Sequence, residues 1–246
     1  GVDVNDYGAI WWTLERRYGV RFAPVNWDGL RRALNDVNVL IMPSGSPGRI
    51  NQRLGKAGAD AIRAWVERGG TLVTMGGASA WAAREDVNLT SARAVGGDTT
   101  GTRRDTAVVN DPALAELTGL ASPTASNASP QPLPGTNFDV VLDRTHWLTL
   151  GYTQPRLTAM LGGDTFLKPS REGTNVAVFP STGLLVRGGF TWPDNTERLL
   201  RGTSLVIDEP TGGGHVIVFN NEPLFRGWWR AMDKLVLNAI VLGPAM

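Results

Sequence analysis

Two short apolar runs, separated by a helix-length segment, most constrain what this chain can fold into. The runs cover residues 37–42 (VNVLIM) and 71–75 (TLVTM). Near-continuous apolar strands of this kind are buried on both faces, which is typical of parallel sheets. The segment 54–68 between them has helical apolar spacing and ends at Gly69 and Gly70. The sequence therefore predicts an α/β fold with a mostly parallel, doubly wound sheet and helices on both faces.

The same patterns predict the remaining elements. We expect helices over residues 6–18, where Asn5 or Asp6 is placed to cap the start, and over 27–35 and 226–242. Short strands are expected over 20–24, 138–142, 158–161, 175–179 and 184–186. A turn or short helix is expected over 146–151, a short helix over 195–201, and a hairpin joining 204–208 to 215–219.

The first helix lacks the preceding strand that this alternation requires. The chain opens Gly-Val-Asp-Val, without a Met and without the pattern of a signal peptide. We interpret it as a processed or excised piece of a longer protein. The first strand has then either been cut away or is supplied by other residues.

The composition supports one domain over residues 1–246, interrupted by an insertion. Hydrophobic residues make up 42% of the chain, which is enough for a full core. Between about residues 87 and 137 Gly, Thr, Ser, Asn, Pro and Arg dominate instead. We predict an irregular insertion there, with one helix near 112–118.

Charge and residue counts exclude several classes of function. The 24 basic and 23 acidic residues leave a net charge of +1, and this balance does not indicate nucleic-acid binding. There is no Cys, hence no disulfide or thiol nucleophile, and two His residues cannot build a His-rich zinc site. No apolar run reaches the ~20 residues that span a bilayer. Gly212–Gly214 lack the Lys-Ser/Thr of a phosphate-binding loop. We therefore expect no metal, no cofactor, no nucleic-acid partner and no membrane span.

The strand over 71–75 runs into a small-residue turn, Gly76-Gly77-Ala78-Ser79. A strand, a tight turn and a helix form the nucleophile elbow of several enzyme families. Ala78 is taken here as the nucleophile position, and it has no heteroatom. Ser79 is one residue further on and is expected to cap the short helix or to bond a loop amide. As a nucleophile it would need a base, for which His146 is the one plausible candidate.

Ligands of α/β sheets bind outside the carboxyl ends of the strands. The loops expected at that edge supply the binding candidates, together with His146, which is placed either in the crevice or in a turn bonded to backbone. Arg226 suits a carboxylate ligand, or an ion pair that fixes the last helix. The candidates are Ser44, Gly76, Gly77, Ser79, His146, Asn220 and Arg226.

Several stretches resemble the glutamine-amidotransferase-like accessory domain of bacterial carboxypeptidase A-like zinc carboxypeptidases. They are Asp6–Trp12, Gly69–Val73, Thr145–Tyr152, Gly214–Phe219, Phe225–Trp229 and Lys234–Ala239. The resemblance covers most of the chain except 87–137. It implies a flavodoxin-like, class I glutamine amidotransferase-like fold, a secreted or periplasmic parent, and a zinc carboxypeptidase domain as partner.

The chain departs from both activities of those families. No H-x-x-E zinc motif is present, so peptidase chemistry would lie outside this chain. Active amidotransferases carry a Cys at the elbow and a His–Glu pair near the chain end. Here Ala78 replaces the Cys, and Glu222-Pro223-Leu224 has no His. The glutamine-hydrolysing activity is not carried over.

Three hypotheses follow from the sequence. The first is a non-catalytic accessory domain that scaffolds, forms homo-oligomers or binds a ligand for its parent protein. The second is a small serine hydrolase using Ser79 and His146. The third is a carbohydrate- or peptide-binding module that uses exposed tryptophans, for which Trp81, Trp147, Trp192 and Trp228 are candidates.

Overall fold

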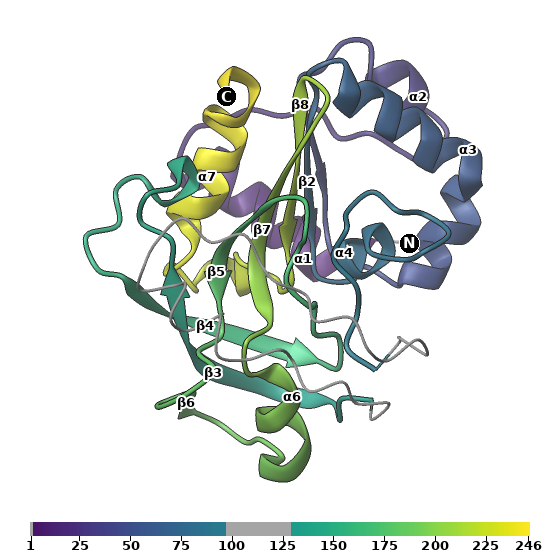
Figure 1. Ribbon diagram of the computed structural model, residues 1–246. Coiled ribbons are helices and arrows are strands. Elements are labelled where there is room, and N and C mark those ends of the chain that lie inside the picture. Colours follow the sequence, from purple (N-terminus) through teal and green to yellow (C-terminus); the bar gives the residue numbers. More distant parts are fainter. Residues whose placement is uncertain (1, 97–128) are drawn as a thin grey trace.

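The computed structural model describes residues 2–96 and 129–246 (Figure 1). Its centre is an eight-stranded sheet with strand order β1-β2-β8-β7-β5-β3-β4, and β6 pairs with β3. Only the pairs β1–β2 and β2–β8 are parallel, and the other neighbours are antiparallel. The sheet is therefore mixed rather than mostly parallel as predicted. It curls so that β3 and β4 run across the lower end of β5 and β7 (Figure 1).

The strands are β1 (Val39–Met42), β2 (Thr71–Met75), β3 (Leu133–Leu142), β4 (Arg156–Gly163), β5 (Thr174–Val178), β6 (Val186–Gly188), β7 (Ser204–Thr211) and β8 (Gly214–Phe219). The helices are α1 (Val4–Trp11), continued by the π-helical η1 (Trp12–Arg17), and α2 (Leu30–Ala33), α3 (Pro47–Glu67), α4 (Gly77–Ala82), α6 (Arg198–Leu200) and α7 (Asp233–Val241). Short helical turns form η2 (Trp147–Thr149), η3 (Pro193–Glu197), η4 (Phe225–Gly227) and η5 (Gly243–Ala245).

Most predicted elements are present, with shifted ends. The run over 71–75 forms β2, and the predicted hairpin forms β7 and β8. The helix predicted over 54–68 forms the longer part of α3, after a break at Gly55, whose φ of 57° is not helical. A first segment of α3 starts at Pro47, where Ser46 caps it and proline suits a first helical position. The last helix starts at Asp233 rather than at Arg226, whose positive φ of 51° breaks the helical path. The cap of α1 is Asp3, whose side chain accepts from the amides of Asn5 and Asp6.

The strand predicted over residues 20–24 does not form. This segment has no strand assignment, although it is apolar at alternate positions. A strand needs a hydrogen-bonded neighbour, and none of the described strands lies beside this segment. The prediction was wrong because sequence pattern does not supply that neighbour.

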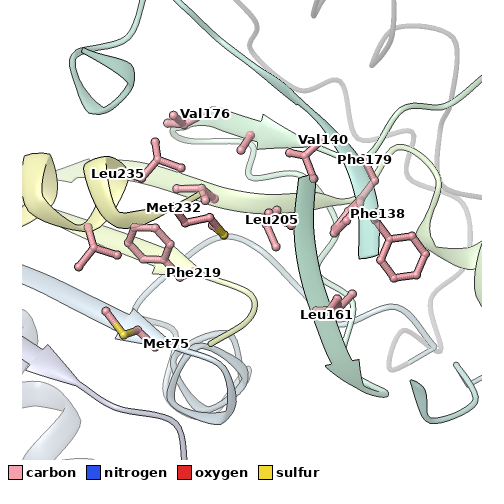
Figure 2. Close-up of a cluster of buried hydrophobic side chains, with 14 of the residues drawn as sticks. Met75, Phe138, Val140, Leu161, Val176, Phe179, Leu205, Phe219, Met232 and Leu235 are labelled. Carbon is pink, nitrogen blue, oxygen red and sulfur yellow. The ribbon is translucent and has the colours of Figure 1, made fainter. Parts of the chain in front are cut away.

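Side chains of the parallel strands alternate between two hydrophobic clusters, one on each face of the sheet. Val73, Ile217 and Phe219 point to the cluster that includes α1 and α7. Leu72 and Val218 point to the cluster that includes α2, α3 and α4. Figure 2 shows the first cluster, where Met232 and Leu235 lie over Phe219 and Leu205. The sheet therefore separates two packed layers, and a side chain of a central strand serves only one of them.

The insertion predicted for about residues 87–137 has packed flanks. Thr90 Oγ1 and Ser91 Oγ donate to the buried carboxylate of Glu209 at 2.8 and 2.7 Å. At the other flank, β3 already begins at Leu133. Both flanks belong to the folded body rather than to a loose excursion. The helix predicted near 112–118 lies outside the described residues.

Candidate functional site

Three loops meet at the carboxyl ends of β1, β2 and β8, as expected from the sequence. The amide of Gly76 donates to the carbonyls of Phe219 and Asn221, both at 2.9 Å. The amide of Gly77 donates to Ser44 Oγ at 3.1 Å. These bonds bring together the loop after β1, the elbow after β2 and the loop after β8.

The strained residue of the elbow is Gly76, not Ala78. Gly76 has φ 50° and ψ −117°, in a region that favours glycine. In an elbow the nucleophile stands on the strained residue of the turn. Ala78 lies inside α4 and is fully buried. The position that corresponds to the nucleophile is therefore corrected to Gly76, which has no side chain at all.

Ser44 occupies the space where an elbow side chain would begin. A Cβ built at Gly76 would lie 2.5 Å from Ser44 Oγ, and one at Gly77 would lie 1.7 Å from the carbonyl oxygen of Gly45. Both contacts are shorter than van der Waals distance. The two glycines are therefore required by the close approach of the loop after β1.

Ser79 does not cap a helix or face a ligand. Its side chain is fully buried, and its hydroxyl bonds Thr74 Oγ1 at 2.9 Å and the Phe219 carbonyl at 2.7 Å. Successive side chains of a strand alternate, so Thr74 shares the face of Leu72, on the side of α3 and α4. Ser79 thus fixes the elbow to β8 from that side.

His146 lies on the other face of the sheet. Its Nε2 contacts Asp208 Oδ2 at 3.2 Å, and His215 Nδ1 contacts Asp208 Oδ1 at 2.9 Å. Asp208 pairs with Ile217 across the hairpin and shares its face, on the side of α7. The sheet separates Ser79 from His146, so the structure does not bring together the residues of the predicted hydrolase pair.

The structure adds an acidic pair that the sequence did not reveal, Asp6 and Glu222. Asp6 is 2% exposed, and its Oδ2 accepts from the Ser44 amide at 2.5 Å. Its Oδ1 is buried and has no hydrogen-bond partner among the described residues. Burial, and the nearby charges of Glu222 and Asp3, raise the pKa of Asp6 to about 7. Burial and the charge of Asp3 also raise the pKa of Glu222.

This electrostatic setting opposes an anionic ligand at the elbow. Ser44 adjoins both acids, since its amide donates to Asp6 and its side chain opposes the rise in the pKa of Glu222. A carboxyl group with a pKa near 7 exchanges its proton at neutral pH, and perturbed values of this kind gather at functional sites. The surroundings of the elbow therefore favour a neutral or cationic group over an anion.

Asn220 and Arg226 were predicted to bind a ligand at this site. Both flank it, and neither side chain points into it. Asn220 is buried, and its Nδ2 donates to the Thr165 carbonyl at 3.2 Å. Arg226 is exposed, and its guanidinium lies 5.0 Å from the centre of the Phe225 ring. The charge of Arg226 nevertheless lowers the pKa of Glu222, so the two side chains are electrostatically linked.

Exposed tryptophans adjoin the loop after β8. Trp12 and Trp228 are 50% and 61% exposed, and both flank Gly227. A Cβ at Gly227 would lie 2.9 Å from Trp12 Cδ1, so the ring packs directly on this glycine. Of the other candidates from the sequence, Trp192 is exposed, Trp147 is half-buried and Trp81 is fully buried.

Two further kinds of site, a metal centre and a membrane-spanning helix, are not found among the described residues. These contain no group of three or more His, Cys, Asp or Glu side chains that could hold a metal ion. Within the same ranges, no helix combines the length and apolarity needed to cross a bilayer.

Comparison with known proteins gives structural likeness only. No family model and no curated protein matches the chain. A putative ThuA-like protein from Bacteroides uniformis matches with a TM-score of 0.50 and 15% identity, over 96% of this chain and 83% of that one. A putative ThuA-like protein from Parabacteroides merdae matches with a TM-score of 0.53 and 10% identity, over 99% and 87%. A putative GMP synthase component from Thermoplasma acidophilum gives 0.53 and 10%, over 95% and 86%.

These likenesses support a glutamine-amidotransferase-like mixed α/β fold with a curled sheet. Because identity is at most 15% in these three matches, they establish the fold alone. None of the three is a carboxypeptidase, and the carboxypeptidase connection rests on the sequence resemblance.

Proposed function

We propose that this chain is a non-catalytic accessory domain that serves a larger protein by binding. The observation that carries the proposal is the closed elbow. Gly76 provides no nucleophile, and Ser44 Oγ fills the space in which a side chain would start. Ser79 is buried and bonded, on the face of the sheet opposite His146. The elbow therefore carries no nucleophile at Gly76, and the pair Ser79 and His146 cannot act together.

Hydrolysis assays test the non-catalytic role. The purified chain is incubated with glutamine, p-nitrophenyl acetate and short peptides, and ammonia, nitrophenolate and free amines are measured. The matched control is the double variant Ser44→Ala, Glu222→Gln, which removes the polar side chains nearest the elbow. We expect equal background rates for both proteins. A rate that is lost in the variant would show that the elbow is catalytic.

We propose, from the resemblance, that the larger protein is a secreted zinc carboxypeptidase. What supports this is the order of the matching stretches along the chain, from Asp6–Trp12 to Lys234–Ala239. The coding sequence that contains this chain tests the proposal. A zinc-binding H-x-x-E motif with a distant His in the same reading frame would support it, and a reading frame without one would contradict it.

A second candidate function, ligand binding through aromatic stacking, is favoured by Trp12 and Trp228. Exposed indoles suit a sugar, which stacks its apolar face on the ring. Titration with cellotriose and maltotriose, followed by tryptophan fluorescence, tests this function. We expect saturable quenching that is lost in Trp228→Ala and kept in Trp192→Ala, whose ring is exposed elsewhere. Identical curves for the two variants would exclude a site at Trp228.

A further inference from the structure

Most of the exposed tryptophans of this chain gather at one place. Four of its nine tryptophans are exposed, namely Trp11, Trp12, Trp192 and Trp228. All but Trp192 lie where the helix formed by α1 and η1 packs against η4. The ring centres of Trp11 and Trp12 are 6.5 Å apart, and Trp12 packs on Gly227, the residue before Trp228. A cluster of large exposed apolar side chains marks a binding surface.

Contacts within the fold hold the indole rings in place. Trp11 Nε1 donates to Glu15 Oε2 at 2.8 Å. Trp228 makes an edge-to-face contact with Trp229, with 5.6 Å between the ring centres. Side chains that are already ordered lose little conformational entropy when a ligand binds to them. The surface is therefore preorganised for stacking.

Three exposed arginines adjoin these rings without an acidic partner. Arg16, Arg226 and Arg230 form no ion pair and no side-chain hydrogen bond among the described residues. Arg17, in contrast, is bound to Asp233 at 3.0 Å. Burial raises the pKa of Tyr18 and the charge of Arg230 opposes this rise, which places Arg230 near the end of η1. Positive charge is therefore available along the edge of the aromatic cluster.

Two of these guanidinium groups stack on aromatic rings. Arg16 lies 6.0 Å from the centre of the Trp11 ring, and Arg226 lies 5.0 Å from that of Phe225. The first contact depends on the π-helical winding of η1, because residues five apart are neighbours in a π-helix and are turned apart in an α-helix. A stacked guanidinium keeps its N–H donors in its own plane, where they can hold a carboxylate bidentately.

We propose that this surface binds an acidic oligosaccharide, whose sugar rings carry carboxylates. The surface is formed by Trp11, Trp12, Arg16, Arg226, Trp228 and Arg230. Apolar ring faces adjoin carboxylates along such a saccharide, as indoles adjoin guanidinium groups on this surface. The inference rests on the sugar-binding function proposed above and names the class of its ligand.

The charges around the surface favour a saccharide over a nucleic acid. Phosphates form a dense and continuous line of charge, which a basic groove must follow. Here Glu15 lies beside Trp11, and Glu222 lies close enough to Arg226 for the two charges to interact. These acids interrupt the positive surface, so it suits a ligand whose charges are separated by neutral groups.

Titration with matched saccharides tests the role of charge. The purified chain is titrated with trigalacturonate and with trimannuronate, and with the methyl ester of each, which has the same rings without charge. Tryptophan fluorescence and isothermal calorimetry measure binding. Since a hydrogen bond to a charged group is worth about tenfold or more in affinity, we expect an acid to bind at least about tenfold tighter than its ester. Salt should reduce this difference, because exposed charges are screened.

Paired variants locate the effect on the surface. The double variant Arg226→Gln, Arg230→Gln removes two charges and keeps the indoles, so its affinity for the acid should fall to that for the ester. Arg198→Gln is the matched control, because Arg198 is exposed on α6, and it should keep the wild-type affinity. Trp228→Ala should weaken acid and ester alike, because it removes a stacking ring. Circular dichroism should be unchanged in all of these variants.

The outcomes separate this inference from the function on which it rests. Equal affinity for acid and ester would overturn the inference and leave sugar binding in place. A lack of binding to every saccharide, neutral or acidic, would overturn both. The inference would also fall if hexathymidylate or tetraglutamate bound more tightly than either acid, or if the double arginine variant kept the full preference for the acid.

Discussion

His146 and His215, the two histidines of the chain, bind opposite oxygens of one buried carboxylate. Asp208 Oδ2 contacts His146 Nε2 at 3.2 Å, and Asp208 Oδ1 contacts His215 Nδ1 at 2.9 Å. The indole of Trp147 also donates to Asp208, at 3.2 Å. Because the Leu148 amide donates to His146 Nδ1, the hydrogen that faces Asp208 is on Nε2. The cluster joins η2 to the β7–β8 hairpin.

Replacing Asp208 should destabilise the chain strongly. Asp208→Asn keeps the shape but removes the charge that three donors share, so we expect a loss of roughly 1.5–3 kcal/mol. Urea unfolding at pH 6 measures it, with Asp164→Asn, at an exposed position, as the control. Burial alone would raise the pKa of Asp208, but the bonds from His146 and His215 outweigh it and lower the pKa. The stabilisation is therefore present above about pH 3.8 and lost on acidification through the lowered value. An unchanged midpoint in Asp208→Asn would contradict this role.

The stability of the chain should also fall as His215 loses its proton. The bond to Asp208 raises the pKa of His215 above 6.5, against the opposing effect of burial. A raised pKa contributes stability that is complete below 6.5 and lost as the pH rises through the raised value. We therefore expect wild type to lose stability relative to His215→Gln from pH 6.5 upward. Thermal unfolding across this range checks the prediction, and parallel pH profiles for the two proteins would refute it.

At Asp6 we expect a stabilising substitution. The pKa of Asp6 is raised from 3.8 to about 7, so its contribution is complete below pH 3.8 and lost as the pH rises through 7. Asp6→Asn keeps an acceptor for the Ser44 amide without the buried charge. Since each tenfold change in an ionisation constant is worth about 1.4 kcal/mol, the variant should be a few kcal/mol more stable at pH 8. Urea unfolding at pH 4 and pH 8 tests it, and a variant weaker than wild type at pH 8 would contradict it.

The sequence predicted what depends on local pattern and missed what depends on long-range pairing. The apolar runs located β1 and β2, and the small residues after β2 located the elbow. The spacing of residues along the sequence could not reveal that Asp6 and Glu222 lie close together, because they come from opposite ends of the chain. Asp6 was interpreted as a possible helix cap, a role that Asp3 fills.

The same distinction explains the errors in the fold. The β7–β8 hairpin was predictable from its glycine turn, because that pairing is local. The antiparallel pairs β7–β5 and β5–β3 were not, since each joins strands that have another strand between them in the sequence. The position of Ser79 across the sheet from His146 follows from strand alternation only once the register is known.

The close approach at the elbow predicts opposite effects for two glycine-to-alanine changes. A Cβ at Gly77 would lie 1.7 Å from the Gly45 carbonyl oxygen, so the loop after β1 must move and Ser44 loses its bond from the Gly77 amide. We expect Gly77→Ala to cost about 3 kcal/mol, as severe overpacking does. Gly8 lies inside α1 with nothing within 4 Å of its built Cβ, so Gly8→Ala should gain about 1 kcal/mol from helix propensity. Denaturant midpoints of the two variants test both predictions. An unchanged midpoint for Gly77→Ala would show that the backbone at the elbow follows a different path from the one described.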